Sequence, residues 1–165
     1  MSYLVIIRGP LAVGKSTVAR KLAYLLKGKH ISVDDLLEKY NLDKIDKKEG
    51  CIPLKNFLQL NEKILPRIKN LLAKGTFVVI DGNFYHKEQI ENLIKSILPN
   101  QSCVFTLKAS LNDCIQRDKN RKKCYGIKAT KAVYELVSKV HCGKKILTSN
   151  KTAEQVANEI VCYLQ

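Results

Sequence analysis

The sequence predicts an α/β fold, a three-layer α/β/α sandwich with a five-stranded, mostly parallel sheet between two layers of helices. One observation behind this prediction is that short apolar runs alternate with longer segments whose apolar residues recur at helical spacing. A second is that the runs are almost continuously hydrophobic, which is typical of strands buried on both faces of a parallel sheet. The predicted strands span residues 3–7, 30–33, 76–80, 102–107 and 145–148.

Helical spacing of apolar residues fills the segments between these strands. The predicted helices span residues 17–26, 52–74, 86–98, 110–117 and 129–140, with a last helix after residue 152. Pro53 suits a first helical turn, whereas Pro66 is expected to kink or divide its helix. Ser110 is an expected N-cap, and Thr152 with Gln155 forms a capping box. Residues 41–50 are polar, lack periodicity and are expected to form a mobile loop.

The composition fits one domain over residues 1–165, with 45% hydrophobic residues and no apolar run long enough to span a membrane. Because Met1 and Ser2 lead directly into the first predicted strand, no signal peptide and a cytoplasmic location are expected. The six cysteines are scattered without a C-x-x-C pair and are expected to be reduced there.

The net charge is +14, and residues 108–151 hold twelve basic side chains against three acidic ones. Such a cluster can attract a polyanion such as RNA or DNA. A bias of genome composition, or the lysine enrichment of a thermophile, explains the same excess without a partner. The two explanations stay open.

Residues 9–16 read G-P-L-A-V-G-K-S, which matches the phosphate-binding loop G-x-x-x-x-G-K-[ST], the Walker A motif. The motif stands between a predicted strand and a predicted helix, as phosphate binding requires, because backbone N–H groups and the helix dipole gather the phosphates. Lys15 is expected to reach the β- and γ-phosphates, and the Ser16 hydroxyl to bind Mg²⁺. The expected nucleotide-binding residues are Gly9, Pro10, Leu11, Ala12, Val13, Gly14, Lys15, Ser16 and Thr17.

Acidic residues follow two further predicted strands, at the end of the sheet where ligands bind. Asp34 or Asp35 is a candidate for orienting an acceptor hydroxyl and taking its proton, while the other caps a helix starting at Leu36. Asp81 is a candidate Mg²⁺ ligand. Contact with a substrate, or capping of the turn into Gly82, remain alternatives for Asp81.

Arg117 and Arg121 are four residues apart and project from the same side of a helix, if one continues through them. Two permanent cations on a mobile segment can close over a triphosphate and stabilise the charge of the transition state. We therefore expect a small lid over about residues 117–129. Solvent-exposed arginines on a basic helix are the alternative.

These elements together resemble the small phosphate-loop kinases, which include polynucleotide 5′-kinases, adenylylsulfate kinase and chloramphenicol phosphotransferase. The resemblance lies in residues 9–17, 33–35, 79–83, 117–121 and 146–150. It implies a P-loop NTPase fold of the nucleoside-monophosphate-kinase type. By position, it places the catalytic aspartate at Asp34, the lid arginines at Arg117 and Arg121, and Thr148-Ser149-Asn150 near the adenine. The arginine that grips a substrate phosphate in polynucleotide kinases is Leu37 here, with Lys39 as a nearby substitute.

The expected function is an ATP- and Mg²⁺-dependent kinase that phosphorylates a hydroxyl group, favouring a polynucleotide 5′-OH or a nucleoside-type acceptor. A small-metabolite kinase, similar to adenylylsulfate or shikimate kinase, is the alternative acceptor class. A non-catalytic, nucleotide-dependent binding switch is the alternative of another kind. The acceptor site is expected within residues 36–70, without a membrane partner, in a monomer or a homodimer.

Overall fold

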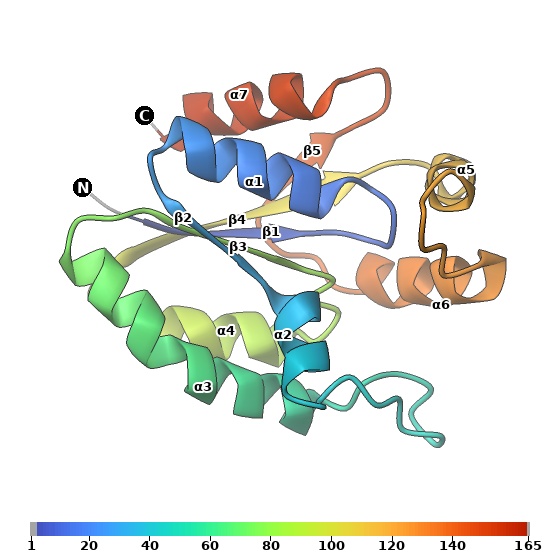
Figure 1. Cartoon of the computed structure of the whole chain (residues 1–165), viewed down its shortest axis with the longest axis horizontal. Helices are drawn as coiled ribbons and strands as arrows, with labels where there is room; N and C mark the ends of the chain where they lie inside the picture. Colours follow the sequence, from blue (N-terminus) through green and yellow to red (C-terminus); the bar gives the residue numbers. More distant parts are fainter. Residues whose placement is uncertain (1–2, 165) are drawn as a thin grey trace.

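The computed structural model describes residues 3–164, which form one five-stranded sheet with helices on both faces (Figure 1). The strands are β1 (Tyr3–Arg8), β2 (Lys29–Ser32), β3 (Val78–Gly82), β4 (Gln101–Lys108) and β5 (Lys144–Leu147). Their order across the sheet is β2-β3-β1-β4-β5, and every pairing is parallel. The predicted α/β sandwich is confirmed.

Alternate residues of the central strand β1 face the two helical layers. Leu4 and Ile6 pack into a core with α2 (Val33–Lys39), α3 (Leu54–Ala73) and α4 (Lys87–Ser96). Val5 and Ile7 pack into a second core with α1 (Lys15–Leu25) and α7 (Ala153–Leu164). Since side chains alternate along a strand, one apolar run supplies both cores. The two remaining helices, α5 (Leu111–Lys119) and α6 (Ile127–Ser138), lie together at one end of the sheet in Figure 1.

The helix after β2 begins three residues earlier than predicted. Val33 does not end the strand but starts α2, because the Ser32 hydroxyl accepts a hydrogen bond from the backbone N–H of Asp35 and so caps the helix. Asp34 and Asp35 therefore lie in the first helical turn, and neither caps a helix starting at Leu36. Negative charge in a first turn is favourable because it faces the positive end of the helix dipole.

The long helix α3 runs through Pro66 without being divided. Pro66 removes one helical hydrogen bond, but the residue is exposed, so water can satisfy the carbonyl oxygen that loses its donor. Ile64 and Ile68 on either side are buried and hold the helix against the sheet. Pro53 is the N-cap rather than a first-turn residue, while the caps predicted at Ser110 and at Thr152 are confirmed.

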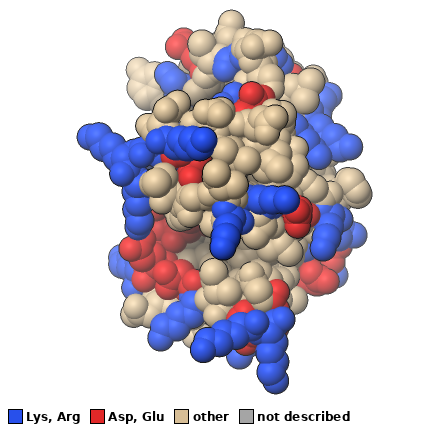
Figure 2. All heavy atoms as spheres, turned by 90° about the vertical axis from the view of Figure 1, so that its right-hand side faces the viewer, with Lys and Arg blue, Asp and Glu red and all other residues tan. Residues whose placement is uncertain are grey.

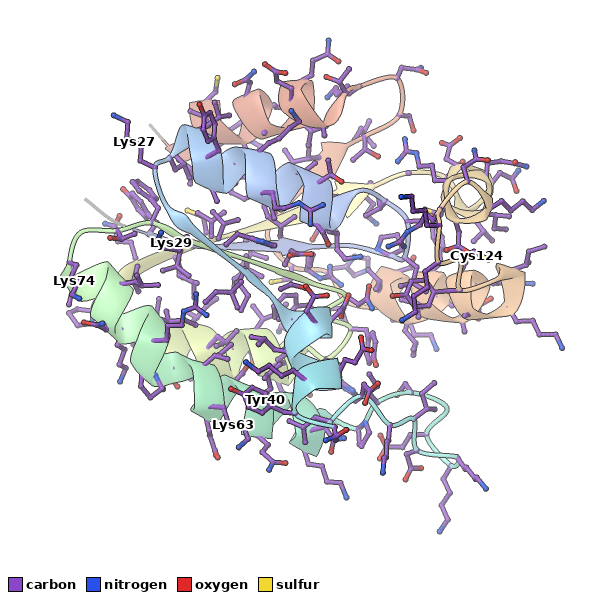
Figure 3. All side chains as sticks on the ribbon, in the orientation of Figure 1. Lys27, Lys29, Tyr40, Lys63, Lys74 and Cys124 are labelled. Carbon is purple, nitrogen blue, oxygen red and sulfur yellow. The ribbon has the colours of Figure 1, made fainter. Side chains whose placement is uncertain are left out.

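Helix α2 also contacts α3 through Tyr40, at its carboxyl end. The ring of Tyr40 lies 5.1 Å from Nζ of Lys63 on α3, and Figure 3 shows these two side chains next to each other. This exposed contact adds to the packing of the buried Val33 and Leu37, which hold the helix that carries Asp34 in the core with α3. Within residues 3–164, no helix is both long enough and apolar enough to cross a membrane.

Candidate active site

The predicted phosphate-binding loop connects β1 to α1 at the carboxyl end of the central strand. Gly14 is the N-cap of α1 with φ of 100°, a left-handed conformation that favours glycine. No side chain caps this helix, so the N–H groups of its first turn are free to bind phosphate oxygens. A cavity of about 370 Å³ lies over the loop and is called here the phosphate cavity. It is lined by Leu11, Ala12, Gly14, Lys15, Ser16, Thr17, Arg20, Asp34, Asp35, Arg117, Arg121 and Tyr125.

Six of the nine residues predicted to bind the nucleotide line the phosphate cavity. Gly9 and Pro10 are buried beneath it, and Val13 lines the neighbouring cavity described below. Lys15 is 6% exposed, and its Nζ donates a hydrogen bond to the carbonyl oxygen of Pro10 at 2.8 Å. Burial lowers the pKa of Lys15, while the nearby carboxylates of Asp34 and Asp81 raise it. A phosphate would give this desolvated ammonium the anionic partner that a neutral carbonyl does not supply.

The two predicted Mg²⁺ ligands are in direct contact. The Ser16 hydroxyl donates a hydrogen bond to Oδ2 of Asp81 at 2.7 Å. One hydroxyl and one carboxylate beside a phosphate site fit Mg²⁺, which binds through few protein oxygens together with water and substrate phosphates. Asp81 is the penultimate residue of β3 rather than the residue after it, and its side chain is 1% exposed. Its Oδ1 atom lies 2.5 Å from Nε2 of His30 on β2, so the carboxylate is held from both sides.

Asp34 lines both the phosphate cavity and a second cavity of about 320 Å³, called here the acceptor cavity. Burial raises the pKa of the Asp34 carboxyl above its ordinary value, while the positive charge of Lys15 opposes the shift. The neighbouring Asp35 is exposed and lines the phosphate cavity but not the acceptor cavity. Of the two aspartates that the sequence left as candidates, Asp34 is therefore the one that lines both cavities.

The acceptor cavity lies between α2, the segment from 41 to 53, and α6. Its lining includes residues from the predicted range 36–70, but α6 supplies a further wall that sequence reasoning did not anticipate. Leu37, which replaces the arginine of polynucleotide kinases, is 1% exposed and packs in the core. Lys39 does not take over the missing charge, since it is exposed, lies 5.9 Å from the Tyr40 ring and does not line the cavity. The full lining is Leu11, Asp34, Leu37, Glu38, Asp43, Ile45, Gly50, Cys51, Ile52, Asn83, Tyr85, Lys123, Tyr125, Ala129, Ala132, Val133 and Leu136.

Arg117 and Arg121 both line the phosphate cavity, but they do not extend from one helix face. Arg117 lies in α5 and donates hydrogen bonds to the carbonyl oxygen of Val13 and to Oγ1 of Thr148. Arg121 lies beyond the end of α5, because the helix stops at Lys119, and its guanidinium stacks on Tyr125 at 5.3 Å. Arg117 is thus held by the phosphate-binding loop and by Thr148, whereas Arg121 belongs to the exposed segment after α5.

The segment after α5 is anchored by Asp118, whose side chain is buried. Its carboxylate accepts hydrogen bonds from the backbone N–H groups of Tyr125 and Gly126 at 2.9–3.1 Å. Both ends of the loop that carries Arg121 are therefore held together, while the loop itself is exposed. This arrangement is compatible with the predicted lid, which stays a prediction.

A third cavity, of about 240 Å³, lies on the other side of the loop from the acceptor cavity. It is lined by Val13, Gly14, Thr17, Val18, Arg117, Thr148, Lys151, Ala153 and Val156. Of Thr148, Ser149 and Asn150, which the family resemblance implies to lie near the adenine, only Thr148 lines this cavity, and adenine binding there stays a prediction. The phosphate cavity shares Arg117 with this third cavity and Asp34 with the acceptor cavity.

A family model described as an AAA domain matches residues 4–140. The chain belongs to the AAA-domain family. No curated protein matches this AAA-domain chain. Solved structures of small kinases do match it: a sugar kinase from Janibacter sp. has a TM-score of 0.78 at 11% identity, over 99% of this chain and 95% of that chain. A shikimate kinase from Acinetobacter baumannii has a TM-score of 0.65 at 21% identity, over 99% of this chain and 93% of that chain.

Thymidylate kinase from Candida albicans has a TM-score of 0.70 at 19% identity, over 99% of the AAA-domain chain and 91% of that chain. Identities this low show a shared fold, not a shared substrate. The family match and these neighbours confirm the predicted resemblance to small phosphate-loop kinases.

The AAA-domain chain also contains a buried arginine that sequence reasoning missed. Arg8, the last residue of β1, is fully buried and forms no ion pair within residues 3–164. Its guanidinium donates to the carbonyl oxygens of Phe84, Val137 and Val140 and to Oγ1 of Thr106. Two of these acceptors lie at the carboxyl end of α6, where a cation also meets the negative end of the helix dipole. Arg8 therefore ties the wall of the acceptor cavity to the strand that leads into the phosphate-binding loop.

Proposed function

We propose that this protein transfers the γ-phosphoryl group of ATP, with Mg²⁺, to the hydroxyl group of a small molecule in the acceptor cavity. The observation that carries the proposal is the position of Asp34, the only carboxylate that lines both the phosphate and the acceptor cavities of the described chain. A general base must reach the acceptor hydroxyl while that hydroxyl faces the γ-phosphate, and a position lining both cavities supports this role for Asp34.

The other site residues supply the electrostatic part of this reaction. Lys15 and Arg121 place positive charge beside the transferring phosphoryl group, and the N–H groups at the start of α1 bind the remaining phosphate oxygens. Ser16 and Asp81 would hold Mg²⁺, which would supply positive charge against the negative charge of the phosphates. Asp34 accepts the proton as the acceptor oxygen attacks. A simple nucleotide-dependent switch needs neither Asp34 nor a cavity behind it.

The acceptor cavity favours a small molecule over a polynucleotide end. Its volume of about 320 Å³ is at the small end of the range for ligand sites, and apolar side chains form most of its wall. The phosphate-gripping arginine of polynucleotide kinases has no replacement in it. Phosphorylation of sugar or shikimate hydroxyls by the structural neighbours supports a small alcohol by analogy alone. Phosphorylation of a polynucleotide 5′-OH remains a prediction that rests on the basic residues after β4.

The test is transfer of label from γ-labelled ATP to three separate pools: small alcohols and sugars, nucleosides, and oligonucleotides with 5′-hydroxyl ends. We expect label in the first pool, and loss of at least about a hundredfold in Lys15→Ala, as for removal of an electrostatic stabiliser. Lys21→Ala is the matched control, because Lys21 lies on the exposed side of the same helix. Hydrolysis of ATP without any labelled acceptor would favour the switch, and labelling of oligonucleotides alone would favour the polynucleotide acceptor.

A further inference from the structure

The acceptor cavity reverses the charge balance of the protein. The chain has 29 Lys and Arg residues against 15 Asp and Glu residues, yet the cavity is lined by three carboxylates and a single lysine. The carboxylates are Asp34, Glu38 and Asp43, and the lysine is Lys123. Figure 2 shows a hollow on this face with acidic side chains gathered on one side of it, while lysine and arginine side chains lie above the hollow and around the outline.

None of these three carboxylates is paired within the structure. Among residues 3–164, the acidic groups in ion pairs are Asp81, Glu91, Glu154 and Glu159, all of them outside the acceptor cavity. Asn83, which also lines the cavity, has a buried side-chain oxygen that accepts no hydrogen bond. The three carboxylates and the Asn83 oxygen are acceptors, and they outnumber the one cation of the lining, Lys123, which is also without an ion pair in the described part of the chain, so the cavity favours a ligand that donates hydrogen bonds.

Two of the carboxylates have a defined spacing. Asp34 and Glu38 are four residues apart in α2, so they lie on the same side of the helix, separated by about 6 Å along its axis. Asp43 approaches from the following segment. Across the cavity, Val133 and Leu136 of α6 form an apolar wall. A ligand that fits all three features has a hydroxyl at one end, an apolar middle and a positive charge at the other end.

We propose that the acceptor cavity selects a cationic alcohol: a compound with an apolar body that carries a protonated or quaternary amine about one helical turn from the hydroxyl group. This inference rests on the proposed kinase function and specifies its substrate class. Asp34 faces the hydroxyl, while Glu38 and Asp43 face the cation. An acceptor that carries a carboxylate or a phosphate would place its negative charge among these side chains and lose affinity through repulsion.

Three matched compounds test the proposal. They are 4-(aminomethyl)benzyl alcohol, which is cationic, its neutral N-acetyl derivative, and the anionic 4-(hydroxymethyl)benzoic acid. Binding is measured by calorimetry with the protein saturated by Mg²⁺ and a non-hydrolysable ATP analogue. Because Glu38 and Asp43 are exposed, we expect a preference of about tenfold for the cation over the neutral compound at low salt, decreasing at high salt. The anion is expected to bind most weakly.

Glu38→Gln is expected to reduce the preference for the cation about threefold, and Glu38→Gln with Asp43→Asn to remove most of it, since each exposed carboxylate contributes modestly. The affinity of the neutral compound stays the same. Glu62→Gln is the control, because Glu62 is an exposed glutamate of α3 outside the cavity. Equal affinities for the three compounds, including no detectable binding of any, overturn the proposal. So does a preference for the anion, or a cation preference that survives the double substitution.

The same compounds separate this inference from the proposed function. Label transfer from γ-labelled ATP is measured with each compound in parallel with binding. A cation preference in binding without transfer to any alcohol would refute the kinase function and leave the cavity's selectivity standing. If the neutral and the anionic alcohols accept label as efficiently as the cationic alcohol does, the selectivity is refuted and the kinase function stands.

Discussion

His30 holds the carboxylate of Asp81 from the side opposite Ser16. Nε2 of His30 lies 2.5 Å from Oδ1 of Asp81, and the Ser16 hydroxyl donates to Oδ2 of the same carboxylate at 2.7 Å. Both oxygens of this nearly inaccessible carboxylate therefore have partners, and these would orient it as the Mg²⁺ ligand that we propose. A residue that orients a ligand from behind in this way typically affects metal affinity almost as strongly as the ligand itself.

The first prediction is that His30→Asn weakens Mg²⁺ binding by about tenfold to a hundredfold, as is usual for residues that support a metal ligand. Asp81 would lose the partner that fixes its orientation, while the phosphate-binding loop stays intact. The measurement is titration of Mn²⁺, as a paramagnetic substitute, into the complex with a non-hydrolysable ATP analogue. His141→Asn is the control because His141 is exposed and distant in the sequence from Asp81. Unchanged Mn²⁺ affinity in His30→Asn would refute this role.

The second prediction concerns the general base. Asp34→Asn should retain ATP binding while phosphoryl transfer falls by about 10²–10⁴, because the amide cannot accept the proton. Asp35→Asn, the exposed neighbour, should have a milder effect. In the wild type, the rate should fall on acidification at a higher pH than the ordinary value of 3.8 predicts, since burial raises the pKa of Asp34. A larger loss in Asp35→Asn would exchange the two roles.

Asp34 also predicts a pH dependence of stability. Because its pKa is raised in the folded state, the folded protein binds the proton more tightly, and stability falls as the pH rises from 3.8 through the folded-state pKa. Above that pKa, the full free-energy cost of burying the charged Asp34 carboxylate lowers the stability of the folded protein. Asp34→Asn should therefore be more stable than the wild type at neutral pH, with a difference that vanishes below pH 3.8. Denaturant unfolding at several pH values checks this, and a constant difference at all pH values would contradict it.

The third prediction separates polynucleotide from small-molecule acceptors. Lys122, Lys123 and Lys128 are exposed in and after the loop that carries Arg121. If an oligonucleotide is the acceptor, its binding weakens steeply with salt, and changing the three lysines to serine flattens that slope. For the cationic alcohol that we propose, the substitutions do not weaken binding, because Lys123 repels it. A salt slope near zero for oligonucleotides would rule out the nucleic-acid acceptor.

The fourth prediction tests the lid. Figure 3 shows Cys124 on the segment between α5 and α6, and its side chain is exposed. If Arg121 moves onto the triphosphate, the segment closes and alkylation of Cys124 slows severalfold when the ATP analogue and Mg²⁺ bind. The measurement is peptide-resolved mass spectrometry in a Cys162→Ser background, which removes the other exposed cysteine. Arg121→Ala should abolish the protection; equal protection in both proteins would mean that Arg121 does not draw the segment down.

Local sequence signals predicted what depends on local structure. The phosphate-binding loop is one continuous motif, and Asp34 and Asp81 follow from the rule that ligands gather at the carboxyl ends of parallel strands. The predicted start of α2 was wrong because Val33, as a β-branched residue, favours a strand, whereas the N-cap at Ser32 starts the helix at Val33. Arg8 was missed because its partners, three backbone carbonyls and the Thr106 hydroxyl, lie up to 132 residues away and leave no pattern in the sequence. The α6 wall of the acceptor cavity was missed for the same reason.

The hydrogen bonds of Arg8 have a consequence for how this fold can change. They join the end of β1 to the carboxyl end of α6. The strand that leads into the phosphate-binding loop and the α6 wall of the acceptor cavity are therefore held together by one buried side chain. In the kinase that we propose, the core would set the distance that a phosphoryl group crosses, whereas exposed side chains such as Glu38 and Asp43 would select the acceptor. Substitutions at those surface positions can replace one acceptor with another without resetting the reacting distance.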